Sequence, residues 1–389
     1  MNDSVYETYV DKDLSNLRRV SLVIPTYNRN YYLSRCLWYH AHFPFAEIIV
    51  ADSSNDIRRA VNRKTITDIQ SLFPTKITYL EYDFPSEKYG GEIYRKWGDA
   101  VQHVNTEYSL SCTDKEFLIP TTVSESVIFL DEHPDYSIAD GMYYQLRSKR
   151  HIVPWQTDKS ITAGNVDDRL NEIIETLKPV GTQFALQRTK NYKQTFTNVE
   201  NYNLYDIRIG ETAIELYPVI LGKTYRNQHS AMSIRDVINF TKKSGFNLSV
   251  RERERESSFH RYPKWYEYPK DYQSTMLKRF ESMYEQCVDE SNKERGDYIL
   301  KLMIQRYGSE NTHSKLLNKS DLLWKIWNSF TPYRIKCLLS HYIGNGIVEY
   351  PLSRREISQE MEMIVNIIIK TQPFYENDQP IRYDKGMMK

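Results

Sequence analysis

Two acidic side chains with a spacing suited to metal binding stand near residue 115. Residues 108–120 read as a short strand that runs into a polar turn carrying Asp114 and Glu116. Because side chains two residues apart in extended chain point to the same face, both carboxylates should project together, with Lys115 pointing away. Paired carboxylates suit a divalent cation that bridges a diphosphate. An acidic turn after a strand is also common without any ligand, so this pair alone leaves both interpretations open.

The segments around this turn predict strands that alternate with helices. Apolar runs predict strands at 20–24, 47–51, 76–81 and 108–112. Helical patterns fill the intervals, which predicts an α/β fold with a doubly wound, mostly parallel sheet. Ligands gather at the carboxyl ends of the strands in such sheets. The polar residues expected at those ends are Thr26, Tyr27, Asn28, Asp52, Ser53, Asp114 and Glu116.

The rest of the chain predicts further α/β elements and then a helical region. Helices are expected at 121–133, 166–177 and 209–222, with strand-like runs at 138–147 and 182–188. Helical patterns follow at 271–290, 293–307, 319–330 and 354–371. The alternating charges at 251–256 are typical of a solvated helix face or linker. The domains expected are an N-terminal extension (1–19), an α/β domain (20–255), a mostly α-helical C-terminal domain (256–371) and a disordered tail (372–389).

Composition excludes several classes of protein. Lys and Arg number 52 against 51 Asp and Glu, so the net charge of +1 gives no reason to expect a nucleic-acid partner. The four cysteines lie far apart, which indicates reduced thiols in a cytoplasmic protein. No apolar run approaches the roughly 18 residues of a membrane span. The amphipathic, aromatic stretch 322–330 favours core or dimer packing; peripheral association with the inner face of the membrane is the alternative.

Four motifs in order resemble the nucleotide-sugar-binding half of the family-two inverting glycosyltransferases, which have the GT-A fold. They are VSLVIPTYNR (20–29), EIIVADSS (47–54), YRKWGDAVQHVNTEYSLSCTDKEFLIP (94–120) and FLDEHPDYSIADG (129–141). The resemblance covers residues 20–141 and continues more loosely to 236. It implies transfer of a sugar from a nucleotide-diphosphate-sugar to a glycan or lipid-linked acceptor, with inversion, assisted by Mn²⁺ or Mg²⁺. Polysaccharide assembly is the setting that it implies.

The resemblance also implies roles for the residues at the strand ends. Thr26, Tyr27 and Asn28 would line the nucleotide pocket beside Ser53, and Asp52 would hydrogen-bond the uracil or the ribose. Asp114 and Glu116 would stand at the metal motif. The family usually has a run of aspartates there, whereas this chain has Asp114-Lys115-Glu116, so Lys115 is expected near the diphosphate. Lys88, in the loop 88–92, is a further candidate contact to the nucleotide.

An inverting transfer needs a carboxylate that takes the proton of the acceptor hydroxyl. By resemblance, Glu211 at the start of the helix 209–222 matches that position, with Asp206 and Glu215 as alternatives. An acidic residue is also favoured there by the helix dipole alone. The segment 225–235 is expected to form a late loop over the diphosphate. In that loop His229 would be a third metal ligand, and Arg226 or Arg235 a phosphate contact.

Other interpretations stay open. A sugar-nucleotide pyrophosphorylase has a related sheet, but it needs a glycine-rich basic loop after the first strand, which this sequence lacks. The altered Asp-Lys-Glu motif is compatible with a catalytically degenerate subunit that only binds a nucleotide sugar. The aromatic residues between 262 and 268 indicate packing of the helical region on the sheet, with an acceptor-sugar platform as the alternative.

Overall fold

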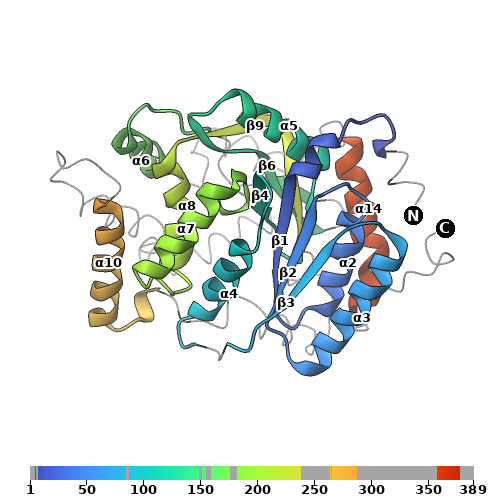
Figure 1. Ribbon diagram of the computed structural model, residues 1–389, viewed down its shortest axis with the longest axis horizontal. Helices are drawn as coiled ribbons and strands as arrows, with labels where there is room; N and C mark the ends of the chain where they lie inside the picture. The colour runs from blue at the N-terminus through green and yellow to red at the C-terminus, as the bar shows by residue number, and fades with distance from the viewer. Residues whose placement is uncertain are drawn as a thin grey trace, which may run out of the picture.

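The computed structural model describes residues 5, 8–84, 87–148, 151–154, 159–175, 182–237, 263, 265–286 and 357–376. Its centre is a nine-stranded sheet in the order β3-β2-β1-β4-β8-β6-β9-β5, with β7 paired to β6. Helices cover both faces: α2, α3 and α14 lie on one side of β1–β3, and α4, α7 and α8 lie on the other (Figure 1). The predicted α/β class is therefore confirmed.

The first half of the sheet is parallel, as predicted. It consists of β1 (Val20–Thr26), β2 (Glu47–Asp52), β3 (Ile77–Glu81) and β4 (Tyr108–Ser111). The crossover helices are α2 (Asn30–His40), α3 (Asp56–Leu72) and α4 (Gly91–Gln102). β1 and β2 are buried along almost their whole length because helices cover both faces, which explains their continuous apolar runs.

The second half of the sheet mixes strand directions. Its strands are β5 (Glu116–Leu118), β6 (Tyr136–Ser148), β7 (His151–Pro154), β8 (Leu186–Arg188) and β9 (Lys223–Asp236). β9 is parallel to β6 and antiparallel to β5. The prediction of a late loop at 225–235 was wrong, because this segment is inside β9. Polar residues and a register shift around Met142 interrupt the period-two pattern that would have indicated a strand.

The remaining helices surround this frame. They are α5 (Pro120–Glu132), α6 (Val166–Glu175), α7 (Thr189–Asn201), α8 (Ile209–Leu221), α10 (Lys270–Glu285) and α14 (Gln359–Glu376). Short 3₁₀ turns are η1 (Ser15–Arg19), η2 (Thr182–Phe184) and η5 (Trp265–Glu267). α5 begins with Pro120, a residue suited to the first turn because its missing N–H is not needed there. None of the described helices is long and apolar enough to cross a membrane.

The helix α14 packs directly on the α/β sheet although it lies far along the chain. Ile364 and Ile368 are completely buried in the same core as β1. Tyr31 Oη of α2 donates to the backbone oxygen of Thr371 at 2.6 Å. α14 continues to Glu376, five residues beyond the end at 371 that the sequence predicted for this helix. The predicted boundary near 255 and the segments 251–256, 293–307 and 319–330 lie outside the described residues.

Candidate functional site

The turns after β1 and β2 are hydrogen-bonded to each other. The backbone N–H of Asn28 donates to Ser54 Oγ at 2.7 Å, and Asn28 Oδ1 accepts from the N–H of Asn55 at 3.0 Å. Asn28 has a φ of 54°, a left-handed conformation that asparagine tolerates better than most residues. Ser53 N–H donates to the backbone oxygen of Thr26. The predicted pocket residues 26–28 and 52–53 are thus brought together at the carboxyl edge of the sheet.

Asp52 is fully buried below these turns. Its carboxylate accepts from Ser54 N at 2.7 Å, from Asn62 Nδ2 at 2.7 Å and from Tyr79 Oη at 2.6 Å. Three donors satisfy a buried carboxylate that would otherwise be costly. Within the protein, the side chain therefore fixes the turn after β2.

Lys96 is a site residue that the sequence did not single out. Its Nζ donates to the backbone oxygen of Thr26 at 2.7 Å and to Ser53 Oγ at 2.8 Å, so it links the ends of β1 and β2 from α4. Its side chain is buried beside the apolar face of α4 that carries Trp97 and Ala100. A lysine on the buried side of an amphipathic helix is unusual, and this signal could have identified it.

Asp114 connects the end of β4 to the end of β1. Its Oδ2 accepts from Thr26 Oγ1 at 2.8 Å, and its Oδ1 lies 3.3 Å from Arg29 Nη1. The Asp114 side chain is 2% exposed and that of Arg29 is 16% exposed. The carboxylate is thus charge-compensated inside the protein, while the arginine reaches the surface beside the strand ends.

Glu116 is not available in the way that the sequence predicted. Its Oε1 accepts from Arg235 Nε at 2.8 Å and Nη2 at 2.6 Å, and its Oε2 accepts from Thr113 N at 2.7 Å. The pair lies at the register position where β5 meets β9. Both oxygens of this nearly buried carboxylate are occupied. A cation held jointly by Asp114 and Glu116 therefore does not fit the arrangement, and we assign no chemical step to one.

The two predicted lysine contacts differ in their surroundings. Lys115 is buried, and its Nζ lies 4.4 Å from the centre of the Tyr32 ring of α2, a cation–π contact. Lys88 is exposed, and its Nζ lies 5.0 Å from the centre of the Tyr89 ring. Only Lys88 is therefore open to solvent near the start of α4.

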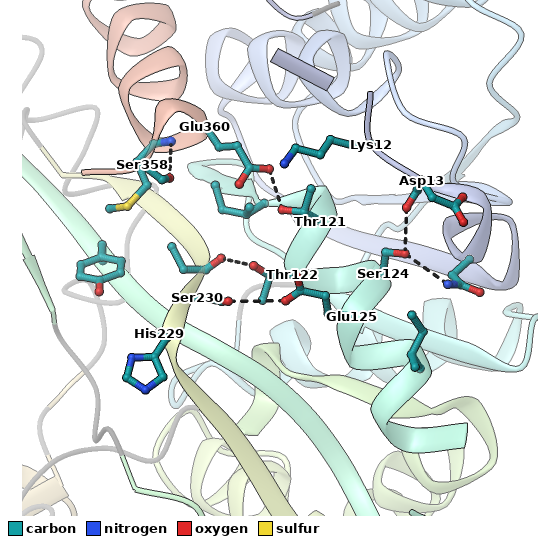
Figure 2. A pocket seen from close by; sticks show the side chains of 16 residues that line it. Lys12, Asp13, Thr121, Thr122, Ser124, Glu125, His229, Ser230, Ser358 and Glu360 are labelled. Atoms are coloured by element: carbon teal, nitrogen blue, oxygen red, sulfur yellow. Dashed lines mark hydrogen bonds between the residues drawn. The ribbon is translucent and has the colours of Figure 1, made fainter. Parts of the chain in front are cut away.

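His229 lies in a different place from the other predicted metal ligands. It lines a cavity of about 400 Å³ together with residues from the N-terminal segment, α5 and α14. Figure 2 shows Ser230 of β9 pointing toward Glu125 of α5, whereas the His229 ring points away from that helix. Between Gly141 and Met142, the pairing on β9 jumps from 227 to 231, so His229 bulges out of the ladder. The prediction that His229 completes the Asp114 and Glu116 site is corrected.

Arg226 also lies away from the predicted phosphate site, in an ion pair with Asp140. Its Nε and Nη2 donate to the two oxygens of Asp140 at 2.8 and 2.5 Å, and both side chains are buried. Burial raises the pKa of the Asp140 carboxyl, and the Arg226 guanidinium opposes this rise. The pair ties β6 to β9 in the sheet, so Arg226 is not placed as a phosphate contact.

The three candidate bases occupy distinct positions around the start of α8. Asp206 accepts from Arg208 N at 2.7 Å and Ile209 N at 3.0 Å, so it satisfies two backbone donors where α8 begins. Burial raises the pKa of its carboxyl, and those N–H groups oppose the rise. Glu215 is buried one turn into the helix, whereas Glu211 is partly exposed. Only Glu211 combines the first turn with access to solvent.

The start of α8 adjoins the start of α4. A Cβ on Gly210 would lie 2.7 Å from the Tyr94 ring, so glycine permits this close approach. Tyr94 Oη donates to the backbone oxygen of Ile207 at 3.3 Å, and Ile207 N–H donates to the backbone oxygen of Tyr89 at 2.8 Å. These contacts put Glu211 at the end of α4 that also carries the loop with Lys88.

The aromatic residues after the predicted linker pack as expected. Tyr268 is buried, and its ring centre lies 4.4 Å from that of Tyr89. Tyr272 of α10 lies 4.2 Å from the same ring, and Trp265 is buried next to Tyr268. This cluster fastens α10 to the loop before α4, so Trp265 and Tyr268 are buried in packing contacts and do not form an exposed platform for a sugar.

No protein-family model matches the chain, and a comparison with curated proteins gives no match. Solved structures do match. They include S. aureus TarS 1–349 in complex with UDP-GlcNAc (TM-score 0.49, 14% identity, 94% of this chain and 93% of that chain). A second is a mannosyltransferase from Pyrobaculum calidifontis in complex with GDP-Man and Mn²⁺, with a TM-score of 0.40 and 12% identity. That match covers 92% of this chain and 87% of that chain. A third is glucosyl-3-phosphoglycerate synthase from Mycobacterium tuberculosis, with a TM-score of 0.33 and 12% identity. That match covers 70% of this chain and 80% of that chain. All three TM-scores are below 0.5.

Proposed function

We propose that the protein is a glycosyltransferase that binds a nucleotide-diphosphate-sugar at the carboxyl edge of β1, β2 and β4. The observation that carries the proposal is the link from Asp114 to Thr26 and Arg29, with Lys96 joining Thr26 to Ser53. Three parallel strands deliver these groups to one edge, the usual place for a nucleotide in an open α/β sheet. The sequence motifs at 20–29, 47–54 and 94–120 support the same function.

The charges at this edge suit a departing diphosphate. Arg29 reaches the surface there, and Lys96 lies directly beneath the backbone of Thr26. Fixed cations that meet charge as it develops on the leaving group lower the barrier to transfer. Asp114 holds Arg29 in place and so acts as a positioning residue. In this proposal the cationic side chains carry the task that the sequence had assigned to a Mn²⁺ or Mg²⁺ site of two carboxylates.

The acceptor would enter from the side of α8. Glu211 is the carboxylate proposed to take the proton of the acceptor hydroxyl as that oxygen attacks the anomeric carbon. Attack from the face opposite the nucleotide inverts the configuration there. The acceptor class, a glycan or lipid-linked saccharide, the polysaccharide setting and a cytoplasmic location remain parts of the proposal that come from the sequence.

Calorimetric titration with UDP, GDP, dTDP and CMP tests this proposal. We expect one nucleoside diphosphate to bind in the presence of EDTA, and Arg29→Met to weaken that binding at least about tenfold, or 1.4 kcal/mol. Asp114→Asn should abolish sugar transfer in a folded protein. His229→Ala is the matched control, because it alters a predicted ligand that lies in another cavity. Failure of every nucleotide to bind, with or without Mn²⁺, would overturn the proposal.

The ion pair between Glu116 and Arg235 supports a second candidate function. A transferase that lost its paired carboxylates can persist as a subunit that binds a nucleotide sugar without transferring it. That protein would bind the nucleotide as above, yet show neither donor hydrolysis nor transfer with any acceptor or metal. Donor turnover by the wild-type chain that is lost in Asp114→Asn excludes this candidate.

A further inference from the structure

Two cysteines and a histidine that no proposed step uses meet directly behind the site. Cys36 lies in the middle of α2, and Cys112 is the first residue after β4. Both are completely buried, and His40 lies one helical turn beyond Cys36. The two sulfur atoms and a ring nitrogen of His40 lie within 4.8 Å of one another. Among the described residues, no other group of His, Cys, Asp or Glu converges in this way.

The hydrogen bonds of His40 speak against a metal ion in this cluster. His40 Nδ1 lies 2.8 Å from the backbone oxygen of Cys36 and 3.5 Å from its sulfur. Its Nε2 accepts from the N–H of Leu118 at 3.3 Å. Both ring nitrogens of His40 therefore already form hydrogen bonds with the backbone. Zinc would have to take a lone pair from one of them and would still have only three side-chain ligands, one fewer than a structural site has.

The two sulfur atoms lie close to each other instead. The Cys36 and Cys112 sulfurs are within 4.8 Å of each other, and both belong to free cysteines. The Cys36 sulfur also lies 3.9 Å from the backbone oxygen of Thr113 and 3.7 Å from that of Glu116. α2 and the turn that follows β4 are thus in contact around this pair, and a disulfide requires the sulfurs to approach from within 4.8 Å to about 2 Å.

We propose that Cys36 and Cys112 are a redox modification site that closes to an intramolecular disulfide. With hydrogen peroxide, the Cys36 sulfur attacks one oxygen, and the O–O bond breaks to leave a sulfenic acid and water. The Cys112 sulfur then attacks the oxidised sulfur and displaces a second water. Two thiols and one peroxide give one disulfide and two waters, so the two electrons are balanced.

Closure would act on the nucleotide edge, a consequence that rests on the proposed function. A disulfide holds its sulfurs about 2 Å apart, so the sulfurs of these two free cysteines must draw closer. Cys112 N–H donates to the backbone oxygen of Val23 at 3.1 Å, at the end of the ladder with β1. Drawing Cys112 toward α2 pulls on that bond and on Asp114, two residues farther along. Oxidation is therefore expected to weaken nucleotide binding.

The test uses the full chain with Cys287→Ser and Cys337→Ser, which leaves only this pair. After treatment with hydrogen peroxide we expect denatured thiols to fall from two to none, with a mass loss of about 2 Da, both restored by dithiothreitol. Because the sulfurs are buried, closure should take minutes to hours through local opening. Cys112→Ala in the same background is the control and should never show the 2 Da loss; peptide mapping of the oxidised parent locates the bond if that control does not fold.

Several outcomes would overturn the inference. They are persistence of both thiols, addition of oxygen atoms without a cross-link, a disulfide between two chains, and stoichiometric zinc in the purified reduced protein that blocks oxidation. The thiol count and the mass do not depend on sugar transfer, so they stand if the proposed function fails. If the reduced chain binds a nucleotide, its affinity should fall at least about tenfold on oxidation.

Discussion

Glu116 of β5 and Arg235 of β9 form an ion pair in which Arg235 Nη2 lies 2.6 Å from Glu116 Oε1. The carboxylate is 1% exposed and the guanidinium 21% exposed, so the pair joins the sheet interior to its edge. The same register places Phe117 opposite Ile234 in the core. A residue that the motif suggested as a metal ligand is thereby a structural link between two strands.

Arg235→Met should therefore lower the free energy of unfolding by about 2 to 4 kcal/mol, because it leaves a buried carboxylate without its partner. Urea unfolding measures this change. Arg63→Met is the matched control: Arg63 also pairs with a glutamate, Glu81, but its side chain is 53% exposed, and its loss should cost under about 1 kcal/mol. Equal costs for the two variants would contradict the structural role of the Glu116 pair.

Lys96→Met should weaken nucleoside diphosphate binding at least about tenfold, since it removes the cation and the donor that hold Thr26 and Ser53 together. The substitution should lower the free energy of unfolding by about 1 to 2 kcal/mol, because two hydrogen bonds are lost. Calorimetry and urea unfolding report the two effects separately. Lys64→Met, on the exposed face of α3, is the control and should change neither. Full affinity in Lys96→Met would remove Lys96 from the site.

Glu211→Gln should bind the donor with unchanged affinity and lose turnover by about 100-fold or more, as expected for removal of a general base. The comparison is with Glu215→Gln, one turn farther along α8 and buried. Asp206→Asn should lower stability rather than turnover in the folded fraction, because Asp206 accepts from two backbone N–H groups at the start of α8. An unchanged kcat in Glu211→Gln would exclude Glu211 as the base.

His42 should make stability depend on pH. Burial lowers the pKa of this imidazole from 6.5 to about 4, against the opposing hydrogen bonds to Trp38 and Tyr39. The folded state thus resists protonation, so stability is complete above about pH 6.5 and falls as the pH drops toward 4, by about 3 kcal/mol in total. Urea unfolding between pH 4.5 and 7.5 measures this slope. His42→Phe should flatten it, whereas replacement of the exposed His103 should leave it unchanged.

The first half of the fold follows from local sequence patterns. Strands β1 and β2 are mostly apolar runs because both of their faces are covered, and α4 has an amphipathic pattern. The turns after β1 and β2 contain Asn28 and Asn55, residue types that favour such conformations and caps. The polar side chains at the strand ends were therefore correctly expected to gather at one edge of the sheet.

The sequence alone determined that α/β core, its carboxyl edge and the presence of Thr26, Asn28 and Asp114 there, because each depends on short-range periodicity. Only the tertiary structure decided which partners those groups have. Spacing along the chain says nothing about which side chain arrives from β9, 119 residues beyond Glu116. For the same reason the sequence missed Lys96 as a link between two turns, and the proximity of Cys36 and Cys112. Such pairings are set by long-range packing, which decides which partner each charged group or thiol meets.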